Sequence, residues 1–286
     1  MLYNLDIMRC RYSFSSYIKE IFSEKILADC LAVMTDQTDK IGGRRRQRPR
    51  IEKIRPIRII GAVVEFIADT SIVSEKGGPE SKIWVSIKYS INLKTEGDDL
   101  VCLDSVIQES RPDSLKFYDE YLLPILDEES IGQLVAEMYK SCYQGDWDLS
   151  SKPKLTDLCN RLGASQVFVD LPDARDVFGI TFFRDSEIEV KEGRKRETRA
   201  FKEGTLILTN RFPKRSRGAQ FFAFGHELAH WRFHRAAYEF ARIAGGLTDF
   251  GIICEDDDTN NLYSTINRKI EKQADSIGAV ICAPGP

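Results

Sequence analysis

The sequence predicts an α+β protein, in which a small β-rich module precedes a C-terminal domain of helices and short strands. Residues 57–110 contain three strand-like runs, one of which alternates apolar and polar residues with period two. From Asp127 onward apolar residues recur at helical spacing, and short apolar runs separate these helical segments. A chain of 286 residues is long enough for such a domain and a smaller one. We therefore expect three parts, namely an N-terminal arm with a basic linker, the β-rich module and the C-terminal domain, over residues 1–56, 57–126 and 127–286.

The N-terminal part combines a helix, a basic segment and strands. A helix is expected over about Ser16–Val33, and strands are expected over 57–68, 83–93 and 99–107. Residues 40–58 carry many Lys and Arg side chains together with Gly and Pro. We interpret this segment as a solvated linker, because no aromatic residues alternate with its charges; a nucleic-acid contact is the alternative. The sequence assigns no chemistry to the β-rich module.

The C-terminal domain is expected to alternate helices with strands. Helices are predicted from their apolar spacing over about 130–143, 154–162, 218–234 and 264–282. Strands are predicted from short apolar runs over 164–171, 178–183 and 204–210. A charged loop around 191–199 is expected to join the last two strands, and a polar loop containing EDDDTNN is expected before the last helix.

Cysteine usage and hydropathy indicate a cytoplasmic protein. The seven cysteines are odd in number and scattered, and no CxxC pair occurs, which favours reduced thiols over disulfides or a cysteine zinc site. No segment reaches the apolar length that spans a membrane. The first residues lack the basic start and long apolar stretch of a secretory signal. We therefore expect no contact with a membrane.

All three histidines of the chain lie between positions 226 and 234, and two of them belong to the segment HELAH. Residues four apart share one face of a helix, so His226 and His230 can bind one zinc ion at ~2 Å each. The flanking residues are apolar and aromatic, which predicts a buried helix whose histidines need polar partners. Glu227 follows the first histidine directly and is the expected general base toward a water molecule that zinc activates.

The last helix offers the third ligand. Glu271 and Asp275 lie four residues apart beside an apolar stripe, and the small residues after them allow close approach to another helix. Glu271 is expected to bind the metal, and Asp275 to accept the second N–H of a ligand histidine, most simply His226. His234 lies about 12 Å along the helix from His226, so we interpret it as a helix-end or pocket-wall residue. Acidic residues in or near loops are rival ligands: Glu239, Asp249 and Glu255–Asp258.

These motifs resemble the ImmA/IrrE family of zinc metallopeptidases. The resemblance rests on HELAHWRFH, preceded by GTLILTN and followed by EKQADSIGAVICAP, and it covers about residues 127–286. The last element fits the family pattern at Glu271, Ala274, Asp275, Ala279 and Pro284. The chain departs from the pattern at the packing positions 222–225, 277 and 278, and residues 1–126 match no module of the family.

The resemblance implies a zincin-like C-terminal domain that binds Zn²⁺ through two histidines and a glutamate, as thermolysin-type enzymes do. It also implies an intracellular zinc-dependent endopeptidase that cleaves a protein regulator, such as a DNA-binding transcriptional repressor of a mobile element or a stress response. The alternative is a non-catalytic regulatory or sensor protein that keeps this fold and acts by binding. The intact Glu227 favours the enzyme, because a binding module needs no base there. His234 and Tyr263 are the candidates for contacting a transition-state oxyanion.

Overall fold

The computed structural model confirms an α+β protein and shows two compact units. It describes residues 13–38, 47–74, 82–94, 101–107, 118–143, 154–172, 177–209, 217–245, 251–255 and 265–283. The N-terminal unit comprises the described residues of 10–125 together with 239–245. The C-terminal unit comprises the described residues of 126–238 and 246–286.

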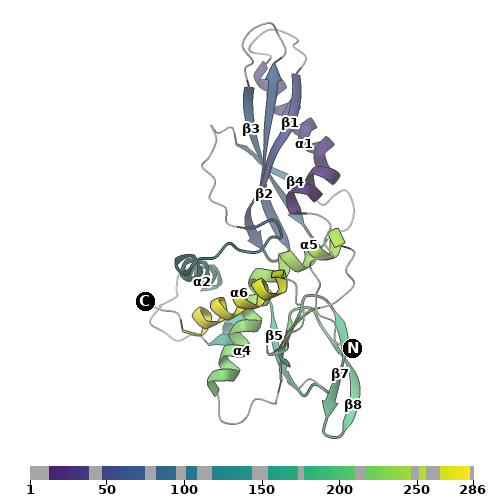
Figure 1. Ribbon diagram of the computed structural model, residues 1–286, viewed down its shortest axis with the longest axis vertical. Helices are drawn as coiled ribbons and strands as arrows, with labels where there is room; N and C mark the ends of the chain where they lie inside the picture. Colours follow the sequence, from purple (N-terminus) through teal and green to yellow (C-terminus); the bar gives the residue numbers. More distant parts are fainter. Residues whose placement is uncertain are drawn as a thin grey trace. The chain divides into compact units, whose positions relative to one another are not determined.

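A helix packed on a four-stranded antiparallel sheet forms the N-terminal unit (Figure 1). The strands follow one another in chain order, and helix α1 packs against β1 and β2. The bounds are α1 (Phe14–Thr38), β1 (Gln47–Ile60), β2 (Val63–Ser74), β3 (Lys82–Asn92) and β4 (Val101–Ile107). Gly61, with φ of 60°, supplies the positive φ that the tight turn between β1 and β2 requires. The buried face of α1 repeats every four residues, at Phe14, Ile18, Phe22, Ile26 and Cys30.

The interpretation of 40–58 as a solvated linker is wrong for residues 47–58, because they form most of strand β1. Residues 39–46 lie outside the described residues. Ile54 is buried, and the neighbouring Arg55 forms two hydrogen bonds, of 2.9 and 3.1 Å, with the carboxylate of Asp69 on β2. The basic residues are therefore compatible with a strand, because cross-strand carboxylates pair with them.

The C-terminal unit is built on a mixed four-stranded sheet in the order β10-β6-β9-β5, in which β5 and β9 are parallel. All five residues of the central strand β9 are buried. Helices α2 (Glu128–Tyr143) and α3 (Leu155–Arg161) precede this sheet in the chain. The strands of the sheet are β5 (Ser165–Val169), β6 (Val177–Phe182), β9 (Thr205–Thr209) and β10 (Gly251–Glu255). Strand β10 falls in a region for which the sequence predicts no strand.

The charged loop predicted around 191–199 is also wrong, because this segment forms a two-stranded hairpin. Strands β7 (Ser186–Glu192) and β8 (Lys195–Phe201) pair antiparallel around Gly193, whose φ is 63°. Ile188 and Val190 alternate with charged residues and are buried. Two inward apolar residues are therefore enough to fix the register of an otherwise charged strand.

One continuous helical segment carries the histidines and extends beyond the predicted end at His234. It consists of α4 (Arg217–Ala229), a π-helical turn η3 (His230–His234) and α5 (Arg235–Gly245). The helix continues because RAAYEFARIAG holds no proline, and no glycine before its end, and is rich in helix-forming alanine. The last helix is α6 (Thr265–Cys282). Among the described residues, no helix is both long and apolar enough to cross a membrane.

Candidate metal centre

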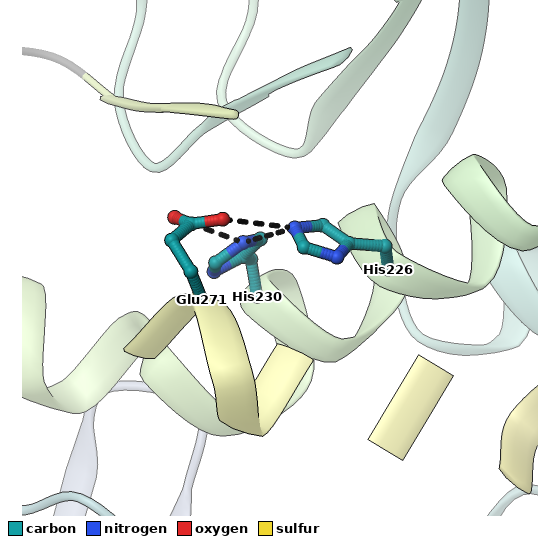
Figure 2. A group of neighbouring side chains, drawn as sticks. All are labelled: His226, His230 and Glu271. Carbon is teal, nitrogen blue, oxygen red and sulfur yellow. Dashed lines mark hydrogen bonds and ion pairs between the residues drawn. The ribbon is translucent and has the colours of Figure 1, made fainter. Parts of the chain in front are cut away.

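Three side chains from two helices converge in the C-terminal unit (Figure 2). His226 on α4 and His230 at the start of η3 point their Nε2 atoms at each other, 2.9 Å apart. Glu271 on α6 places its two carboxylate oxygens 3.2 Å from His226 Nε2 and 3.6 Å from His230 Nε2. The three residues that the sequence predicts as ligands are therefore the ones that the fold brings together.

The spacing of these atoms fits a metal ion. Ligands at 2.0–2.1 Å from a tetrahedral zinc are separated from one another by about 3.3 Å. The three separations observed, 2.9, 3.2 and 3.6 Å, lie on either side of this value. Both histidines are buried, whereas 35% of the Glu271 side chain is exposed. A ligand can therefore reach the group from the Glu271 side.

Asp275 occupies the position predicted for it, behind His226. Its Oδ1 lies 2.9 Å from His226 Nδ1, so the carboxylate accepts the Nδ1–H of the ring. In the neutral ring this leaves the lone pair on Nε2, the atom that faces His230 and Glu271. An imidazole oriented by a carboxylate in this way is the usual arrangement of a metal-binding histidine.

The crossing of α4 and α6 brings these ligands within reach of each other. A Cβ atom on Gly225 would lie 2.8 Å from the carbonyl oxygen of Gly278, and one on Gly278 would lie 2.8 Å from the backbone nitrogen of His226. The two backbones thus touch where both residues are glycine. The close helix approach that the small residues of α6 predict is confirmed at this crossing.

Glu227 lies against strand β6 and is almost completely buried. Its Oε2 accepts a 2.5 Å hydrogen bond from the hydroxyl of Thr181, which also donates to the Glu227 carbonyl at 3.2 Å. A Cβ atom on Gly179 would lie 2.2 Å from Oε1, so only glycine leaves room for this carboxylate. Strand β6 therefore fixes the orientation of the predicted base.

The charges around the group favour a cation. Burial by itself lowers the pKa of His226, but its hydrogen bonds to Asp275 and Glu271 outweigh burial and raise this pKa to about 10. Burial raises the pKa of Glu271, and the neighbouring His230 and His226 outweigh this and hold it well below its usual range. The carboxylates thus stabilise positive charge at the point where the imidazole nitrogens meet.

His234 is not a helix end, so that part of the interpretation is wrong, and its role as a pocket wall stays a prediction. It lies inside the continuous helical segment, is completely buried, and places Nδ1 2.9 Å from Nδ1 of His230. Its Nε2 lies 3.3 Å from Oε1 of Gln273 on α6. Burial and the neighbouring His230 hold the pKa of His234 well below its ordinary value.

Of the remaining candidates, Glu239 is the one whose side chain the structure describes, and it does not join this group. Glu239 lies in α5, where its carboxylate pairs with Arg242 at 3.2 Å. Tyr263, Asp249 and residues 256–258 lie outside the described residues, and Glu255 ends strand β10. Sequence analysis missed three contributors: Thr181, Gly179 and Gln273. Gly179 carried a signal, because a glycine within an apolar strand marks the close approach of another group.

Comparison with known proteins gives no further assignment. No family model matches the chain, and neither a curated protein nor a solved structure does. The structure by itself supports a coarser statement, namely that His226, His230 and Glu271 form a group that can hold a metal ion.

Proposed function

We propose that this protein is a zinc-dependent peptidase whose metal is held by His226, His230 and Glu271. The observation that carries the proposal is the meeting of two imidazole nitrogens and a carboxylate within 3.6 Å of one another, beside the buried Glu227. Two histidines and one glutamate are a ligand set of catalytic zinc sites, which keep one position open. Nitrogen and carboxylate donors favour zinc over magnesium or calcium, which prefer oxygen ligands alone.

Glu227 is the proposed general base. It directly follows the ligand His226 on the same helix, and its carboxylate is held against β6 by the hydroxyl of Thr181. From this position it takes a proton from the attacking water and delivers it to the leaving amine. Zinc, when bound, polarises the scissile carbonyl and makes water more acidic. Thr181 therefore orients the base.

The proposed substrate is a folded or partly folded protein inside the cell. The resemblance to the ImmA/IrrE family supports a zincin-like domain and an endopeptidase that cleaves a regulator such as a transcriptional repressor. The exposure of Glu271 supports access of a polypeptide to the group, and an exposed aromatic ring, Phe222, lies one helical turn before His226. This ring offers an apolar surface beside the reacting bond.

The test compares the wild type with Glu227→Gln. Both proteins are loaded with zinc and incubated with any transcriptional repressor encoded beside this gene, and in parallel with a peptide mixture from a whole proteome. New chain ends are then identified by mass spectrometry. Glu227→Gln removes the base while preserving the shape of the side chain, so we expect cleavage to fall by about 10²–10⁴-fold and the zinc content to stay near one ion per chain.

Three results would contradict the proposal. The first is a wild type that binds no zinc, and the second is cleavage that survives Glu227→Gln unchanged. The third is a zinc-loaded wild type that cleaves neither the repressor nor any peptide, which would favour the alternative of a regulatory or sensor protein that acts by binding.

A further inference from the structure

The third histidine of the cluster lies behind the metal group rather than in it. His234 is completely buried and contacts Nδ1 of His230, whereas His226 and Glu271 face Nε2 of the same ring. Gln273, which is also buried, contacts the far nitrogen of His234. The two residues come from different elements, η3 and α6, so their meeting is a product of the fold and not of local sequence.

With Oε1 of Gln273 facing a neutral His234, one arrangement of protons satisfies this chain of contacts. The Gln273 Oε1 atom can only accept, so Nε2 of His234 carries the proton that it receives. A neutral ring then has a lone pair on Nδ1, which accepts the Nδ1–H of His230 at 2.9 Å. His230 is left with its lone pair on Nε2, the atom directed at His226 and Glu271.

The π-helical turn explains how His234 reaches this position. In an α-helix a residue eight positions after His226 lies about 80° around the axis from it. The wider turn of η3 brings four residues to less than a full rotation, whereas four α-helical residues exceed one. The rotation about the helix axis from His230 to His234 therefore falls short of a full turn, whereas that from His226 to His230 exceeds one. The two deviations offset each other, so the three rings lie along one side of the helix.

We propose that His234, backed by Gln273, is a positioning residue that fixes the Nδ1–H tautomer of His230 and thereby keeps His230 Nε2 available to the metal. Without an acceptor behind it, His230 can place its proton on Nε2, where the proton occupies the position that the metal needs. At the exposed side of the site a carboxylate, that of Asp275, fixes the Nδ1–H tautomer of His226 in the same way. At the buried side, where an unpaired charge would be costly, a neutral histidine accepts the Nδ1–H of His230 instead.

The first test is zinc affinity, measured by competition with a chelating dye and without any substrate. His234→Leu removes the acceptor and should weaken binding by about 10–100-fold, the range found when outer partners of metal ligands are lost. His234→Asn places Oδ1 near the position of Nδ1 and should keep the affinity close to that of the wild type. Phe233→Leu, a packing change in the same turn, is the control and should also leave the affinity near that of the wild type.

The second test reads the tautomers directly in the wild-type protein. The whole chain has only three histidines, so ¹⁵N-histidine labelling gives six ring nitrogens, which two-bond proton–nitrogen NMR spectra of the zinc-loaded protein can resolve. We expect protonated Nδ1 on His226 and His230, and protonated Nε2 on His234. A proton on Nδ1 of His234, or equal zinc affinity of His234→Leu and wild type, would overturn the inference.

This inference rests on the metal group of the proposed function, but the two fail differently. If zinc binds and depends on His234 while no peptide is cleaved, the peptidase is wrong and the positioning role stands. If peptides are cleaved and His234→Leu binds zinc as tightly as the wild type, the positioning role is wrong and the peptidase stands.

Discussion

The interface between α1 and its sheet is built from large side chains, whereas the α4–α6 crossing is built around glycines. In the N-terminal unit Phe14 of α1 packs edge-on against Phe66 of β2 at 5.6 Å, and Phe66 stacks on Tyr89 of β3 at 5.4 Å. In the C-terminal unit Gly225 and Gly278 have no side chain of their own, and the backbones of the two helices approach each other there. The first interface buries large apolar rings, whereas the second brings two backbones into contact.

The difference follows from what each interface must achieve. Buried aromatic rings remove much apolar surface from water and so stabilise the fold. Two glycines bury little surface, but they let Glu271 of α6 reach the histidines of α4 and η3 at metal-ligand distances. The aromatic interface should therefore be sensitive to loss of atoms, and the glycine crossing should be sensitive to gain of atoms.

The largest expected effect is on stability at the aromatic interface. Phe66→Ala removes a completely buried ring, and we expect it to lower the free energy of unfolding of the N-terminal unit by about 3–5 kcal/mol. Chemical denaturation gives the loss, and the chelator competition gives the zinc affinity in the absence of denaturant. If Phe66→Ala lowered zinc affinity as strongly as it lowers stability, the two interfaces would not act independently, which would contradict this comparison.

The second effect comes from adding one methyl group at the crossing. In Gly278→Ala the new Cβ would lie 2.8 Å from the backbone nitrogen of His226 and 3.0 Å from the carbonyl carbon of Gly225, so the helices must move apart. We expect a stability loss of about 1–3 kcal/mol and a fall in zinc affinity, measured on the same protein.

Gly132→Ala is the matched control for this substitution. It adds the same methyl group to α2 at an exposed position where no atom lies within 4 Å of the new Cβ. It should stabilise the protein by about 0.5–1 kcal/mol and leave the zinc affinity unchanged. If Gly278→Ala behaved like this control, the crossing would not set the distance between the ligands.

The parts of the site that were predictable from the sequence depend on helical periodicity. Residues i and i+4 share a face wherever the helix is regular, so His226 with His230, and Glu271 with Asp275, could be assigned before the fold was known. The stripe that these acids form with Gly278 likewise pointed to a close helix contact. That prediction needs only the spacing along one helix and the size of the residues.

The parts that escaped prediction depend on partners distant in the sequence or on irregular backbone. Strand β1 holds two prolines and many arginines, and it is a strand because β2 pairs with it through two register irregularities, one of them at Pro56. Thr181 meets Glu227 only when β6 lies against α4. The position of His234 depends on a π-helical turn, which has no recognised sequence signal.

A third effect, on zinc affinity, is expected from the outer partner of His226. Asp275→Ala removes the carboxylate that accepts the Nδ1–H of His226, and we expect binding to weaken by about 10–100-fold. The same hydrogen bond stabilises the protonated His226 ring, so the free energy of unfolding of the metal-free protein is measured beside the affinity. Ser276→Ala, at the adjacent exposed position of α6, is the control and should leave zinc affinity unchanged. Equal losses of affinity in both variants would mean that a change in helix α6, and not the loss of the Asp275–His226 hydrogen bond, weakens zinc binding.

The smallest effect tests whether polar contacts add much at the aromatic interface. The hydroxyl of Tyr89 donates a 3.0 Å hydrogen bond to Asp29 of α1, and Asp29 also pairs with Lys25 at 3.2 Å. In Tyr89→Phe the ring that stacks on Phe66 remains, and Asp29 keeps Lys25 and water as partners, so the free energy of unfolding should fall by only about 0.5–1.5 kcal/mol. Denaturation beside Phe66→Ala measures the ratio of the two losses. A loss as large as that of Phe66→Ala would show that the Tyr89 hydroxyl, and not the buried rings, holds α1 on its sheet. The contrast with the glycine crossing would then be one of polar contacts and not of side-chain volume.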